Sequence, residues 1–159
     1  MLPTPNDRKP TLKSGTPDHE DVNIILKLYE LRREAVMRQA RDAMAMWTPT
    51  SYEEFVAVTQ WGHPHNAHFR QVSSYWEMCA TFVNQGALHE ELFWQTNGEA
   101  IFFFARVEPF IERYRKEIEN PGALKQLEEL IKRRPDGPAR LAMFKSRIAK
   151  MSESAKRAK

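Results

Sequence analysis

The sequence predicts an all-α fold, and three observations support this prediction. Residues that favour helix, above all Ala, Leu, Met, Glu, Lys and Arg, are abundant throughout the 159-residue chain. No stretch rich in Val, Ile and Thr alternates with polar residues, so a β-sheet has no evident source. Eleven of the 17 aromatic residues fall between residues 69 and 114, which indicates a dense core there. We therefore expect a single domain of five to six helices, built around an antiparallel helix pair at residues 66–85 and 99–118.

The predicted helical domain spans residues 18–151 and is flanked by two flexible segments. Residues 1–17 contain four prolines and little that can be buried, which is typical of a flexible N-terminal arm. Residues 152–159 are charged and polar, and we expect them to form a flexible basic tail. With 42% hydrophobic residues, the chain is long and apolar enough for one domain with a substantial core.

The first predicted helix runs from Asp18 to about Trp47 without interruption. Asp18 is a suitable N-cap residue, and acidic residues follow it in the first turn, where the helix dipole favours negative charge. Apolar residues then recur close to helical spacing, and we expect Val22, Ile25 and Tyr29 to face the core.

The predicted helix pair carries most of the aromatic residues. A serine–glutamate capping box opens a short helix at residues 52–60, and a loop then leads to the helix at residues 66–85. Gly86 is suited to end that helix, because glycine readily adopts the left-handed conformation of a helix C-terminus. A polar, acidic elbow leads to the helix at residues 99–118, which Pro109 should kink, because proline removes one helix hydrogen bond.

Two further helices follow the pair. Asn120 and Pro121 match the N-cap and first-turn preferences of a new helix. Residues 134–138 form a turn rich in Pro and Gly, and the last helix is amphipathic. Its apolar side carries Leu141, Phe144 and Ile148.

The composition also bears on cellular location. The chain has a single cysteine, Cys79, within an apolar helical pattern, so it forms no internal disulfide and suits a reducing compartment. The N-terminal residues lack the apolar stretch of a signal peptide, and no apolar run approaches the roughly 20 residues that span a bilayer. We therefore expect a soluble, cytoplasmic protein without a transmembrane segment.

The run YWEMCATFVNQGALHEELFWQTNGE, residues 75–99, and the aromatic helix that follows it carry a family resemblance. They resemble a broadly distributed bacterial family of unknown function, whose members share a helix with Trp and Asn, a Gly-containing acidic elbow and a following aromatic helix. The resemblance covers about residues 20–118. It implies a small helical domain, and it implies no catalytic residue and no substrate.

Three histidines near the start of the 66–85 helix are the candidates for a metal site. Imidazole nitrogens bind zinc and related metals, and Glu77 could complete a set formed by His63, His65 and His68. No HExxH, CxxC or Glu-x-x-His motif accompanies them, and solvated loop histidines are the simpler interpretation. The sequence predicts no cofactor and no catalytic residue. The acidic residues of the elbow are interpreted as helix caps.

Positive charge is concentrated at the C-terminal end of the chain. Residues 125–159 carry a net charge of +7, although the whole chain carries only +3. Basic residues along a helix can bind phosphates or anionic lipid headgroups, but no nucleic-acid-binding motif is recognised. The candidate anion-binding residues are Arg133, Arg134, Arg140, Lys145, Arg147 and Lys150.

The excess of aromatic residues favours a role in protein–protein contacts. Three consecutive phenylalanines point about 100° apart on a helix, so one packed interface does not cover all of them. We expect Phe102 to face outward. Together with Phe93 and Trp94 in the elbow, it would contact another copy of the chain in a homo-oligomer, or another protein. The sequence thus favours a non-enzymatic helical protein. Binding of nucleic acid or an anionic surface is the alternative, and a metal-dependent enzyme using the histidines is a second one.

Overall fold

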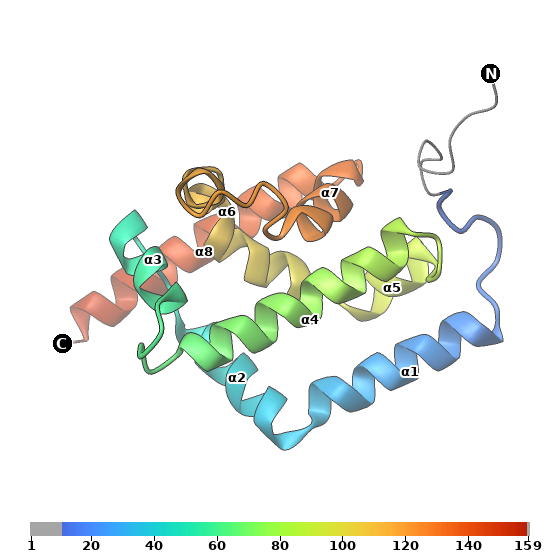
Figure 1. Ribbon diagram of the computed structural model, residues 1–159, viewed down its shortest axis with the longest axis horizontal. Helices are drawn as coiled ribbons and strands as arrows, with labels where there is room; N and C mark the ends of the chain where they lie inside the picture. Colours follow the sequence, from blue (N-terminus) through green and yellow to red (C-terminus); the bar gives the residue numbers. More distant parts are fainter. Residues whose placement is uncertain (1–10, 159) are drawn as a thin grey trace.

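The computed structural model of the protein describes residues 11–158, and within them it contains eight α-helices and no β-strand (Figure 1). The all-α prediction is therefore confirmed, although the number of helices exceeds the five to six expected. In chain order the helices are α1 His19–Arg33, α2 Ala35–Met46, α3 Tyr52–Thr59, α4 Asn66–Asn84, α5 Glu90–Thr96, α6 Glu99–Glu117, α7 Lys125–Arg133 and α8 Gly137–Arg157.

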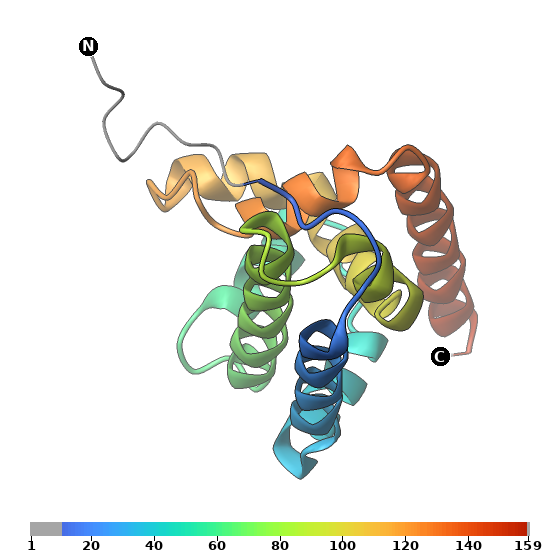
Figure 2. The same ribbon diagram turned by 90° about the vertical axis from the view of Figure 1, so that its right-hand side faces the viewer.

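Helix α4 lies at the centre of the molecule. Helices α2 and α7 pack closely along it, and α8 packs along α6 at one edge (Figures 1 and 2). Helix α1 lies at the opposite edge, where it contacts α2 and α5. Aromatic residues from several helices fill the centre, and the largest fully buried side chains include Trp76, Phe55, Phe93 and Phe104. Each contributes roughly 1.5–3 kcal/mol through burial.

The prediction of a single helix at residues 18–47 is wrong, because the segment forms two helices that are divided at Glu34. The backbone of Glu34 is extended (φ −57°, ψ 143°), so it cannot continue a helix. Its carboxylate accepts hydrogen bonds from the N–H groups of Val36 and Met37, at 3.1 and 3.2 Å. Glu34 therefore acts as the N-cap of α2 and fixes the change of direction between α1 and α2.

The predicted antiparallel pair is also corrected. Both helices exist, as α4 and α6, but their backbones are not among the closely packed pairs. Bulky side chains such as Phe69 and Phe103 lie between them, with ring centroids 6.2 Å apart. Helix α6 continues through Pro109, and its ribbon changes direction partway along its length, as proline favours (Figure 2).

The segment before α1 lies against the elbow between α4 and α5. The amine of Lys13 pairs with the carboxylates of Asp18 and Asp21, at 2.9 and 3.0 Å, and the carbonyl of Gly15 lies 2.8 Å from Nε2 of His89. At the other end, α8 continues to Arg157. Residues 1–10 and 159, which belong to the predicted arm and tail, lie outside the described residues. None of the described helices is long and apolar enough to cross a bilayer.

Candidate functional site

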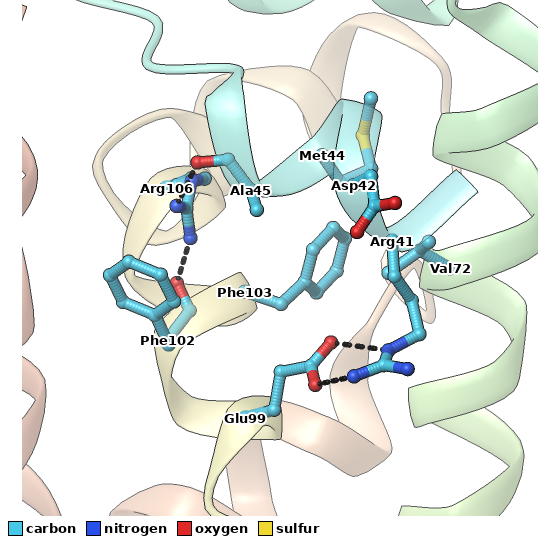
Figure 3. Close-up of a pocket in the computed structure, with 9 residues that line it drawn as sticks. All are labelled: Arg41, Asp42, Met44, Ala45, Val72, Glu99, Phe102, Phe103 and Arg106. Carbon is cyan, nitrogen blue, oxygen red and sulfur yellow. Dashed lines mark hydrogen bonds and ion pairs between the residues drawn. The ribbon is translucent and has the colours of Figure 1, made fainter. Parts of the chain in front are cut away.

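A cavity of about 240 Å³ lies between α2, α4 and α6 (Figure 3). An ion pair spans it: Nε of Arg41 donates to one carboxylate oxygen of Glu99 at 2.9 Å, and a terminal nitrogen donates to the other at 2.5 Å. This bidentate bond raises the pKa of Arg41. The pair joins α2 to the first turn of α6, so both charged groups of the cavity already have protein partners.

Arg106, on the wall of the same cavity, is 3% exposed. Its guanidinium donates to the carbonyls of Ala45 and Trp47 at 2.8 Å, and to that of Phe102 at 2.7 Å. Ala45 lies in the last turn of α2 and Trp47 is its C-cap, so their carbonyls have no hydrogen-bond partner within the helix. Burial lowers the pKa of Arg106 to about 10, so the side chain stays charged at neutral pH. The ion pair and the hydrogen bonds of Arg106 hold α2 and α6 together, and Asp42, which also lines the cavity, is exposed.

The candidate metal ligands His63, His65, His68 and Glu77 do not come together. Nδ1 of His63 accepts the backbone N–H of His65 at 3.1 Å, and Nδ1 of His65 lies 3.2 Å from Nδ1 of His68. Only the rings of His65 and His68 therefore place side-chain nitrogens close to each other. Across residues 11–158, no group of three His, Cys, Asp or Glu side chains is arranged to hold a metal ion.

Glu77 lies farther along α4, and its carboxylate caps another helix, α7. Its two carboxylate oxygens accept the N–H groups of Gln126 and Leu127, each at 2.9 Å. Helix α7 begins at Lys125, not at Pro121 as predicted, and its N-cap residue, Leu124, supplies no side-chain hydrogen bond. The carboxylate of Glu77 replaces the missing cap, a role that only the tertiary structure reveals.

The elbow is stabilised by a buried carboxylate that sequence reasoning missed. Asp21 is fully buried, and it accepts the N–H groups of Asp18 and His89, each at 2.9 Å, besides the pair with Lys13. Burial raises the pKa of Asp21, but these hydrogen bonds outweigh it, so the pKa is lowered overall. Nδ1 of His89 in turn accepts the N–H of Leu92 and caps α5. The elbow is a capped junction, but Asp21 and His89 provide the caps, whereas its acidic residues Glu90 and Glu99 pair with Arg133 and Arg41.

The aromatic residues predicted to contact a partner are largely inside the protein. Phe93 is fully buried and Trp94 is 4% exposed, because α5 turns both rings into the core. Phe102 is partly buried between the guanidinium of Arg106, 3.9 Å from its ring centroid, and the ring of Phe144, at 5.2 Å. The outward-facing patch expected of these three residues does not form.

Apolar residues are instead exposed on α1. Val22, Leu26 and Tyr29 are 44%, 54% and 45% exposed. They follow one another at i, i+4 and i+7, so they form one row along the helix, which we call the α1 row. The inward side of α1 is formed by Asp21 and Leu28, about a third of a turn away. Val22 and Tyr29 were predicted to face the core, and their exposure corrects that prediction.

Residues 17–134 match a family described as a domain of unknown function, DUF4760. The chain belongs to this family. The match confirms the resemblance seen at residues 20–118 and covers α1 to α7. Comparisons with curated proteins and with solved structures found no match. The α1 row therefore lies within the DUF4760 domain, and all of α8 lies beyond the match.

Four of the six predicted anion-binding residues have acidic partners. Within the DUF4760 match, Arg133 pairs with Glu90 at 2.9 Å and Arg134 with Asp136 at 2.7 Å. Beyond it, two more of the predicted anion-binding residues have acidic partners: Arg140 lies 3.9 Å from Asp136, and Lys145 lies 2.8 Å from Glu108. Among the described residues, Arg147 and Lys150 form no ion pair, and both are exposed. Of the six predicted anion-binding residues, the two without an acidic partner thus both lie on α8.

Proposed function

We propose that this DUF4760 protein is a non-enzymatic interaction module whose contact surface is the α1 row. The observation that carries the proposal is the exposure of Val22, Leu26 and Tyr29, each at least 44% exposed, in one line along a single helix. Exposed apolar residues scattered singly need no explanation, whereas an aligned group marks a surface that another protein covers.

The position of α1 supports this role. Its inward side is fixed at both ends: Asp21 accepts the N–H of His89, and the carbonyl of Leu28 accepts the hydroxyl of Tyr75 at 2.8 Å. The helix is therefore held at the edge of the molecule (Figure 2), and the side chains of its row are exposed to solvent. A rigid apolar row costs little conformational entropy when a partner binds, because the helix is already ordered.

Site-specific photo-crosslinking in cells tests the proposal. A photoreactive amino acid replaces Leu26 in one variant and Leu31 in another. Both leucines are exposed on α1, at 54% and 45%, but Leu31 points about 140° away from Leu26. We expect covalent protein adducts from position 26 and few from position 31. Equal adduct yields at the two positions would contradict a specific surface.

A second function is favoured by the free charges on α8. Arg147 and Lys150 are exposed without acidic partners, beside the half-exposed Met143 and Met151. Basic residues interspersed with apolar ones on one helix side suit binding to an anionic surface, as the charge of the C-terminal region suggested.

Co-sedimentation with anionic lipid vesicles, and binding to duplex DNA as a separate probe, test this second function. Reversal of both charges in the double variant Arg147→Glu, Lys150→Glu should lower binding at least tenfold at low salt. Reversal of Lys27 and Arg38, two exposed basic residues on α1 and α2, changes net charge equally and is the matched control. Equal losses in both double variants would show a net-charge effect without a site on α8.

A further inference from the structure

We infer that the α1 row binds the α1 row of a second copy of this chain, with the two helices antiparallel. This inference rests on the proposed function and names the partner. A two-fold axis places the same surface of both copies in contact, so each element of the surface must be complementary to itself. The α1 row meets this condition in both its apolar side chains and its charges.

The apolar side chains are placed for self-pairing. The spacing of Val22, Leu26 and Tyr29 is the alternating four- and three-residue spacing of a helix–helix seam. Leu26 is the middle residue of the helix His19–Arg33, so a two-fold axis near it overlays the full length of both rows. Contact with the other copy would cover three side chains that the single chain leaves about half exposed.

The charges favour the antiparallel orientation over the parallel one. The N-terminal end of α1 keeps a net negative charge, because Lys13 offsets only one of the three carboxylates of Asp18, Glu20 and Asp21. In the last turn, Arg33 lies on the side of the α1 row, whereas Arg32 donates to Asn97. Antiparallel helices place the acidic end of one copy beside the basic end of the other, and they also oppose the two helix dipoles favourably. Parallel helices would bring like charges together at both ends.

The size of the surface sets the strength of the dimer. A helix of 15 residues is about 22 Å long at 1.5 Å per residue. One pair of such helices buries less than the roughly 1,200–2,000 Å² of stable protein complexes, so the dimer should be weak and depend on protein concentration.

Cysteine crosslinking of purified protein tests the geometry. The native Cys79 is fully buried, so introduced cysteines react with a short bis-maleimide without interference. The Leu26→Cys variant should crosslink to itself. A mixture of His19→Cys and Arg33→Cys chains should also crosslink, because antiparallel helices place the two ends together, whereas each of these variants alone should not. Crosslinking of either end variant alone would show a parallel dimer and overturn the inference.

Sedimentation velocity of the purified full chain tests the surface itself. The wild type should dimerise as its concentration rises, and Leu26→Glu should raise the dissociation constant at least tenfold. Leu31→Glu introduces the same charge on another side of α1 and should dimerise like the wild type. Both leucines are exposed, so neither change disturbs the fold. A wild-type protein that stays monomeric up to millimolar concentration overturns the second-copy inference. If position 26 nevertheless forms photo-adducts with a different protein, the interaction module stands and only its partner changes.

Discussion

Arg106 is the residue on which the end of α2 depends. Its guanidinium donates three hydrogen bonds to backbone carbonyls, at 2.7–2.8 Å, while its pKa is lowered by burial. Arg106→Met keeps the apolar stem and removes the donors, so the partly buried carbonyls of Ala45 and Trp47 lose their partner. We expect the free energy of unfolding in urea to fall by about 3 kcal/mol. Arg113→Met is the control, because that arginine is exposed, and it should change stability by less than about 0.5 kcal/mol.

Gly86 is required by the approach of the N-terminal segment. Its φ is +74°, and a Cβ atom added to it would lie 2.2 Å from the carbonyl oxygen of Thr11. Gly62 has a similar φ, +90°, but nothing lies within 4 Å of its Cβ position. Gly86→Ala should therefore destabilise the protein by about 1 kcal/mol more than Gly62→Ala in thermal unfolding. Equal effects would mean that the contact with Thr11 contributes nothing.

Glu128 couples stability to acid pH. It is 4% exposed and pairs with Arg115, Lys125 and Lys132 at 2.6–3.1 Å. Burial raises its pKa, but the hydrogen bonds from these partners outweigh burial and lower it from 4.5 to about 2. The carboxylate is therefore more acidic in the folded state, and its stabilising effect is complete above pH 4.5 and lost as pH falls towards 2.

The shift corresponds to about 3 kcal/mol, and Glu128→Gln should remove it. Urea unfolding at a series of pH values measures the difference in stability between wild type and variant. We expect this difference to be largest above pH 4.5 and to shrink as pH approaches 2. A constant difference over this range would show that the carboxylate is not ionised preferentially in the folded protein.

At the scale of the element, α7 depends on a residue from another helix. The carboxylate of Glu77 in α4 accepts the N–H groups of Gln126 and Leu127, which no local side chain caps. Glu77→Ala should cost about 1–2 kcal/mol, the usual value of an N-cap. Amide hydrogen exchange should show faster exchange at Gln126 and Leu127 in particular. Ser74→Ala, one turn earlier and exposed, is the control and should leave both amides protected.

The helices were predictable where caps and stops are local. Ser51 caps α3 through the N–H of Glu54, and α4 ends next to Gly86, as the sequence indicated. The break at Glu34 was not predictable, because glutamate is a good helix former and its capping role depends on a non-helical backbone at that one residue. The prediction of where α7 starts failed for a related reason, since the cap of α7 comes from Glu77, far away in sequence.

The candidate site was less predictable than the fold. Apolar residues occupy more than one side of α1, which is itself a sign that one packed face cannot cover them all. Which side stays exposed depends on how α1 sits against α2 and α5, and the periodicity does not contain that information. Conversely, the polar sequence around Phe93 and Trp94 predicted that both would be exposed for contact with a partner, but they are buried because α5 turns them inward.

At the scale of the whole molecule, the proposed dimer should affect stability. A second copy that binds only the folded chain stabilises it by mass action, so thermal stability should rise with protein concentration. Mass action and the entropy of unfolding set the size of this effect, and we expect a rise of about 1–3 °C in Tm for each tenfold increase in concentration above the dissociation constant. Differential scanning calorimetry over a hundredfold range of concentration measures this dependence.

The variants on α1 show which surface causes the effect. Leu26→Glu should remove the concentration dependence of Tm, because two carboxylates would meet near the two-fold axis. Leu31→Glu should retain it, since that side chain points away from the α1 row. High salt should reduce the dependence in the wild type by screening the paired acidic and basic ends of α1. If Leu26→Glu and the wild type show the same concentration dependence, self-association occurs through another surface and α1 is not its cause.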